Sequence, residues 1–154
     1  MERESIVARD ASVVIGIVGT VLVVSSHDAM QTDQLALLRE GHRRIASLYP
    51  SGFSALHVLS AARMTRMSAA DRREAESISD TYAPHKRAEA IVVEGSGLFG
   101  AAVRAFIVTL GMRQTSTYPT EVFATLDEGA RWLGPLAQID PVTLGAFTRS
   151  LRAG

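Results

Sequence analysis

Hydrophobic positions along this chain form two kinds of pattern, unbroken apolar runs of strand length and stripes at helical spacing. The opening part holds two or three short runs, broken at Asp10 and Gly19, which predict an antiparallel strand pair. The later runs are bounded by polar or turn residues and predict buried strands. The predicted strands occupy residues 5–10, 13–19, 20–24, 53–60, 88–94 and 121–124.

Helical stripes occupy the segments between and after these runs. Ser68 and Thr125 each precede an acidic residue three positions later, a pattern typical of helix N-caps. Asp140 followed by Pro141 opens a last helix in the same way. The apolar stripes are Leu35, Leu38, His42, Ile45 and Tyr49 in the first helix and Leu144, Phe147 and Leu151 in the last.

Alternation of buried strands with helices predicts an α/β fold, with a mainly parallel sheet and right-handed crossovers. We expect one domain over residues 1–138, with residues 139–154 forming a C-terminal helix or tail packed on that domain or on a partner. The link before Ser68 is predicted to be irregular. The helix over residues 98–112 is apolar around most of its circumference, so we expect it to be sandwiched in the core or covered by another subunit.

Charge and composition narrow the function classes. The 154 residues carry 16 basic and 16 acidic side chains, so nothing in the balance predicts a nucleic-acid or anionic-membrane partner. Cysteine is absent, which excludes disulfides and thiolate chemistry and fits a reducing compartment. Residues 12–24 are too few to span a bilayer, and residues 95–112 carry Arg104 near their middle. With no signal-peptide pattern at the start, we predict a cytoplasmic protein without integral membrane association.

Residues 95–100 read GSGLFG, which is the G-x-G-x-x-G spacing of a dinucleotide-binding turn between a strand and a helix. In that fold the turn follows the first strand, whereas here it follows the penultimate one. Glu121 lies near the distance expected for the ribose-binding acid, but it begins its strand instead of ending it. The motif therefore predicts no nicotinamide or flavin cofactor, and we expect none of any other kind.

Two interpretations of this turn remain. Backbone N–H groups and the helix dipole favour a small anion at Gly95, Ser96 and Gly97, with Glu94 and either Arg63 or Arg104 as further binding groups. Alternatively, the glycines only allow a tight turn and close packing of helix on sheet, and Glu94 and Arg104 neutralise each other or a neighbour.

No set of residues predicts catalysis or metal binding. Ser25, Ser26, His27 and Asp28 are adjacent, whereas a hydrolase triad is assembled from separate segments. A loop that leads into a helix, with Asp28 or Thr32 near the helix cap, is a better explanation than a triad. The histidines show no metal-ligand spacing, and those at positions 42 and 57 are expected in the core or at an interface.

The segments AIVVEGSGLFGAAVRAF and YPTEVFATLDEGARWL carry a resemblance to a known group. They resemble the C-terminal half of SpoIIAA-like proteins of the STAS/SEC14-type superfamily, above all its small bacterial members. The motif itself covers about residues 88–133, and the order of elements about 5–137. The closing pattern corresponds here to Val122, Phe123, Thr125, Glu128, Ala130, Trp132 and Leu133.

The resemblance implies a sheet of four or five strands with helices packed on it, and a role in protein–protein interaction or small-ligand sensing. STAS-type anti-sigma antagonists carry a phosphorylatable serine in a D-S-S-G turn after the third strand. The matching stretch here is Ser60-Ala61-Ala62-Arg63-Met64, which lacks both the Asp and the Gly. The resemblance therefore does not imply that switch, although Ser60, Thr65 and Ser68 remain candidates for modification.

Two hypotheses from different classes follow. The leading one is a non-catalytic regulatory or protein-interaction module that self-associates as a homodimer. It rests on the low polarity of residues 98–112 and on the apolar stripe between residues 144 and 151. The alternative is a binding protein for a small anionic or lipid-like ligand at residues 94–100. An enzyme is the least favoured class.

Overall fold

The computed structural model describes residues 3–64, 66–113 and 117–154. Its centre is a six-stranded sheet whose strands lie side by side in sequence order. They are β1 (Glu4–Arg9), β2 (Val13–Val18), β3 (Val21–Ser26), β4 (Phe53–Ser60), β5 (Lys86–Glu94) and β6 (Thr120–Phe123). β1, β2 and β3 are antiparallel neighbours, and β3 to β6 run parallel.

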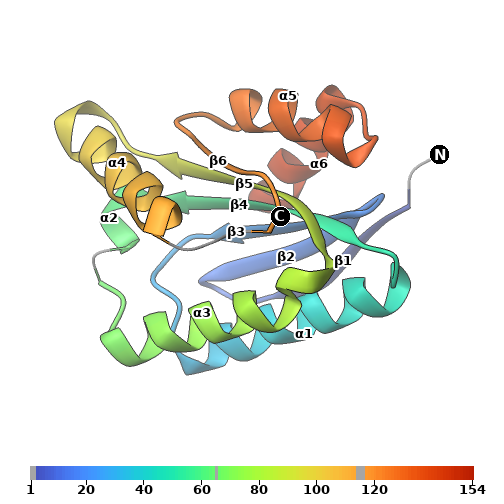
Figure 1. Cartoon of the computed structure of the whole chain (residues 1–154), viewed down its shortest axis with the longest axis horizontal. Coiled ribbons are helices and arrows are strands. Elements are labelled where there is room, and N and C mark those ends of the chain that lie inside the picture. The colour runs from blue at the N-terminus through green and yellow to red at the C-terminus, as the bar shows by residue number, and fades with distance from the viewer. Residues whose placement is uncertain (1–2, 65, 114–116) are drawn as a thin grey trace.

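The helices form a layer on each face of the sheet, with one helix standing apart. They are α1 (Thr32–Leu48), α2 (Ala61–Met64), α3 (Ala69–Tyr82), the 3-10 turn η1 (Ala83–His85), α4 (Gly97–Arg113), α5 (Leu126–Ala137) and α6 (Pro141–Ala153). Figure 1 shows α1 and α3 on one face and α5 and α6 on the other. α4 stands at the end of the sheet toward which β4 and β5 point, near α2.

The sheet separates two hydrophobic cores, because successive strand residues point to opposite faces. On the α1/α3 face Phe53, Ile45 and Ile78 pack together, and all three are fully buried. On the α5/α6 face Leu56 packs in one cluster with Leu144 and others from the last two helices. The apolar runs of β2 to β5 are therefore covered on both sides, which agrees with their lack of alternating polar residues.

The two edges of the sheet are protected against pairing with another strand. β1 carries a bulge between Ile6 and Ala8, and exposed charges stand at Glu4 and Arg9. β6 is only four residues long. Short, bulged and charged edges are the usual means by which proteins prevent edge-to-edge association.

The predicted capping residues are confirmed. The Ser68 side chain accepts a hydrogen bond from the Asp71 amide at the start of α3, and Thr125 accepts one from Glu128 at the start of α5. Asp140 accepts bonds from two amides at the start of α6. The α/β class, the antiparallel opening and the parallel remainder are also confirmed.

Several predictions are wrong. The sheet has six strands instead of the four or five that the resemblance implies, because all three opening runs form strands of the sheet. The link after β4 is helical in α2 instead of irregular. The N-cap of α1 is Gln31, and Thr32 follows it as the first residue of the helix, so Thr32 does lie near the cap as expected. The helix over residues 98–112 is not sandwiched in the core. The stripe of α6 is buried on the domain's own sheet, so it offers no surface for self-association: Leu144, Phe147 and Leu151 are all at most 5% exposed.

Candidate functional site

The glycine turn brings helix α4 into direct contact with the end of β5. A Cβ atom added at Gly100 would overlap the carbonyl group of Gly95, and one added at Gly95 would lie 2.9 Å from the Ala61 Cβ. Gly97 has a φ of 70° and open space around it, so it supplies the left-handed conformation that starts the helix. Close packing thus accounts for Gly95 and Gly100, and backbone conformation for Gly97.

The charged residues of this turn already have partners. Arg152 of α6 binds Glu94 through two contacts, Nη2 to Oε1 at 2.5 Å and Nη1 to Oε2 at 3.3 Å. Arg104 donates to the carbonyl oxygens of Val93 at 3.1 Å and Gly95 at 3.2 Å. Glu94 and Arg104 therefore do not pair with each other. The Glu94 carboxylate is neutralised by α6, and the Arg104 guanidinium hydrogen-bonds the carbonyl groups at the end of β5.

The other predicted residues have separate positions in the structure. Ser60 is the register partner of Glu94 on the neighbouring strand and is half-buried. Ser68 is exposed, and its hydroxyl group serves as the cap of α3. Thr65 lies outside the described residues, and so does the side chain of Arg63. Glu94, Gly95, Ser96 and Gly97, with Arg104, form a continuous group.

The strand order gives a physical reason against a dinucleotide site. Such sites lie in the crevice where the strand order of an open α/β sheet reverses direction. Here the order runs from β1 to β6 without reversal. The topology therefore creates no switch-point crevice beside residues 95–100.

The outer face of α4 is apolar throughout its described side chains. Large exposed residues dominate it: Leu98 is 91%, Phe99 54%, Phe106 58% and Val108 47% exposed. Small exposed residues complete the face, namely Ala101, Ala102 and Ala105. The residues turned toward the domain are Gly100, which is buried, and Val103, Arg104 and Ile107, which are partly buried. We call the seven exposed residues between 98 and 108 the α4 face.

The α4 face is unusual for a helix of a soluble domain, whose solvent-facing side is normally polar. Four of the eight large hydrophobic side chains that are exposed among the described residues belong to it. Large exposed apolar patches are common at sites where proteins contact partners, membranes or ligands. The sequence pattern indicated this helix, but it did not show which of its sides the domain itself covers.

A buried polar cluster between the sheet and α3 escaped the sequence prediction. Glu89 of β5 is at its centre: the Tyr118 hydroxyl donates to Oε2 at 3.0 Å, and Lys86 Nζ lies 3.5 Å from Oε1. His57 Nε2 is 2.9 Å from Oε1 but is not aligned for a hydrogen bond. Lys86 also donates to Ser79 of α3 at 3.3 Å. In the sequence, this cluster was indicated only by Glu89, a charged residue near the start of the apolar run 88–94.

Electrostatic contacts keep Glu89 ionised despite its burial. Desolvation is the largest influence and acts to raise the pKa of Glu89, but His57, Lys86 and Tyr118 together hold that pKa well below its usual value. Burial, and then the charge of Glu89, raises the pKa of the Tyr118 phenol. The side chains of Lys86 and Glu89 are only 1% and 10% exposed, so the cluster anchors Tyr118 to the sheet just before β6.

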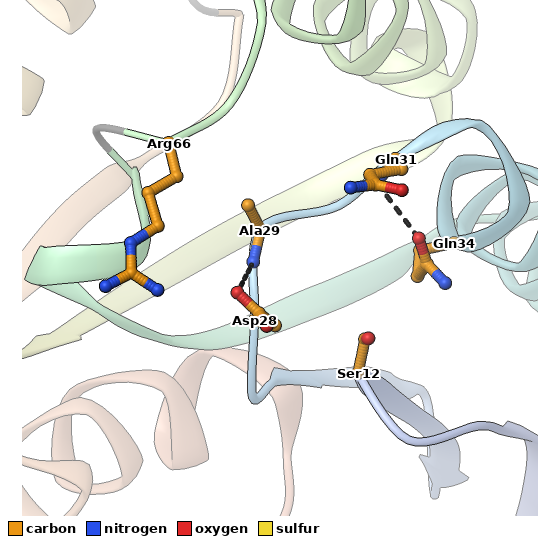
Figure 2. A pocket seen from close by; sticks show the side chains of 6 residues that line it. All are labelled: Ser12, Asp28, Ala29, Gln31, Gln34 and Arg66. Carbon is orange, nitrogen blue, oxygen red and sulfur yellow. Dashed lines mark hydrogen bonds between the residues drawn. The ribbon is translucent and has the colours of Figure 1, made fainter.

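A cavity of about 340 Å³ lies elsewhere, at the start of α1. Figure 2 shows Arg66 on one side of it and Gln31 and Gln34 on the other, with Asp28 and Ala29 between. Ser12 completes the lining. Asp28 accepts a hydrogen bond from the Ala29 amide at 2.8 Å, and the cavity's one acid and one base give it no preference for an anion. No residue of the glycine turn lines it.

Within the described parts of the chain, no three metal-ligating side chains come together. None of the helices described is long and apolar enough to cross a membrane. Neither a protein-family model nor a curated protein matches the sequence.

Proposed function

We propose that this protein is a non-catalytic, STAS-like interaction module that binds other protein chains through the α4 face and self-associates through the same face. The observation that carries the proposal is the seven-residue apolar surface on α4, which the domain does not cover. Burying such a surface against a partner gains about 25 cal/mol for each Å² removed from water. Protein contact is therefore the function that this geometry supports best.

The non-catalytic part of the proposal rests on where the acid and base groups lie. The densest group, around Glu89, is enclosed by β5, α3 and Tyr118, with its charges paired. A general acid or base must reach the proton that it transfers. A group that is ionised, paired and nearly inaccessible fits an anchoring role better than catalysis.

STAS-like membership is supported by the α/β class and by the motif residues, most of which pack in or against the core while Thr125 and Glu128 cap α5. The Phe123 and Trp132 rings lie 5.7 Å apart, and Ala130 and Leu133 are buried residues of α5 that pack in the core cluster with the sheet. The alternative of a small anionic or lipid-like ligand at residues 94–100 has weaker support, because Glu94 and Arg104 are already engaged.

Sedimentation velocity over micromolar to submillimolar concentrations tests the proposal. We expect the weight-average sedimentation coefficient of the natural chain to rise with concentration and that of Phe106→Glu to stay at the monomer value. Val142→Glu is the matched control, because Val142 is 76% exposed but lies on α6. A monomer throughout would contradict self-association, and equal effects of both substitutions would contradict the use of α4.

A further inference from the structure

We propose that the partner of the α4 face is a second copy of this chain, bound so that the two α4 helices cross antiparallel about a two-fold axis beside Ala102. This inference rests on the proposed function and specifies its partner and geometry. Four features of the described residues support it, namely the charge of the face, the placement of its aromatic rings, its small residues and the rest of the surface.

Charge favours a second copy over a charged partner or a lipid surface. Every residue of the α4 face is uncharged, so two copies meet without burying an unpaired charge. The chain has a formal net charge of zero, so no long-range repulsion keeps copies apart. An interfacial helix that binds anionic lipid carries basic residues beside its apolar face. Here Arg104 is directed at backbone carbonyl groups instead.

The large side chains of the face are placed for self-complementarity. Phe99 and Phe106 are two helical turns apart and lie on the same flank of the face. A two-fold axis that is perpendicular to the helix and midway between these two residues brings Phe99 of one copy beside Phe106 of the other. Aromatic pairs in offset or edge contact are stabilised beyond the burial of their area.

Small residues at the middle of the face let the helices approach closely. Ala102 lies next to the proposed axis, with Ala101 and Ala105 on either side along the helix. Interaxial distances near the lower end of the 8–10 Å range require small side chains at the crossing point. The antiparallel direction also pairs opposite ends of the two helix dipoles, whereas a parallel pair would place like ends side by side.

Other surfaces of the domain are less suited to self-association than the α4 face. The sheet edges are blunted by the β1 bulge and the shortness of β6, and the stripe of α6 is buried. The described part of the face spans about 15 Å, a smaller contact than the roughly 800 Å² per partner of stable dimers. We therefore expect a reversible dimer with a dissociation constant of about micromolar order.

Cross-linking of single-cysteine variants tests the geometry, because the natural chain has no cysteine. Phe99→Cys alone and Phe106→Cys alone should cross-link poorly with a short thiol-reactive reagent, whereas an equal mixture of the two should give a covalent dimer. Ala102→Cys alone should also cross-link, because it lies at the axis. Ala70→Cys, an exposed alanine of α3, is the control that should stay monomeric.

Each other outcome has a defined meaning. Cross-linking of Leu98→Cys as efficiently as Ala102→Cys, with no gain in the mixture, would indicate a parallel pair and overturn the inference. If the natural chain dimerises but none of the α4 variants cross-links, the second-copy geometry is wrong while self-association stands. If the natural chain is monomeric in sedimentation and no variant cross-links, both this inference and the self-association proposed above fail.

Discussion

Arg152, near the end of the last helix, neutralises Glu94, at the end of β5, through a two-contact ion pair. The pair joins α6 to the strand that precedes the glycine turn. Both side chains are partly exposed, at 32% and 40%, so the contribution of the pair to stability is limited by solvent screening.

We predict a small coupling energy between these two residues. A double-mutant cycle of Glu94→Gln and Arg152→Met, followed by urea unfolding, should give about 0.5–1 kcal/mol in low salt and less in high salt. The more exposed pair of Arg149 with Asp127 serves as the reference and should couple more weakly. A coupling energy above about 2 kcal/mol would show that the pair is effectively buried in solution.

Substitution of the two turn glycines should separate packing from backbone conformation. Gly97→Ala meets no neighbouring atom and should cost only about 1–2 kcal/mol of unfolding free energy for its left-handed backbone. Gly100→Ala forces α4 away from the Gly95 carbonyl group and should cost more, despite the better helix propensity of alanine. If urea unfolding shows that Gly100→Ala is as stable as Gly97→Ala or more stable, the packing interpretation is refuted.

The buried cluster should be sensitive to loss of its central carboxylate. Glu89→Ala leaves Lys86 buried without its ionic partner and should lower the unfolding free energy by about 3–5 kcal/mol. Glu121→Ala, an exposed glutamate on the adjacent strand, should change it by less than about 0.5 kcal/mol. Comparable losses in both variants would mean that the Glu89 contacts add no stability.

Acid should destabilise the fold through His42. Burial, followed by the charge of Lys86, lowers the pKa of His42 to about 3, while its Nδ1 lies 2.9 Å from the Leu38 carbonyl. The unfolded chain, with an ordinary pKa near 6.5, binds the proton first. Stability therefore falls as pH falls from about 6.5 toward 3, by at most about 1.4 kcal/mol per pH unit for this group.

The test is urea unfolding between pH 6.5 and pH 5, a window chosen to lie above the unfolded pKa of Glu89. His42→Phe, which suits the contacts of this ring with Phe53 and Tyr82, should flatten the slope in that window. Below about pH 4.5 the depressed pKa of Glu89 adds a second loss, because that carboxylate must be protonated. An unchanged slope in His42→Phe would show that another group is responsible.

Much of the fold could be predicted because local signals were unambiguous. The run at residues 53–60 matches β4 at both ends, and Ser68, Thr125 and Asp140 cap the helices that they were expected to cap. These signals depend on residues within one turn of each other, so a single sequence shows them.

The rest depended on contacts between distant segments. Tyr118 meets Glu89 from 29 positions away, and Arg152 meets Glu94 from 58 away, so no local pattern could reveal either. Both α4 and α6 carry apolar surface in the sequence, yet that of α6 is buried on the sheet and much of that of α4 is exposed. The hydrophobicity of a helix shows that it has an apolar surface, but the fold determines whether that surface is buried within the same chain.

Hydrogen exchange of the α4 amides as a function of protein concentration tests the central claim most directly, because it reports on this helix in the unmodified chain. We predict that amides within residues 98–108 exchange more slowly as concentration rises, while the exposed amides of α3 keep a constant rate. Exchange in α4 that is independent of concentration, or protection that grows on another surface, would contradict the account.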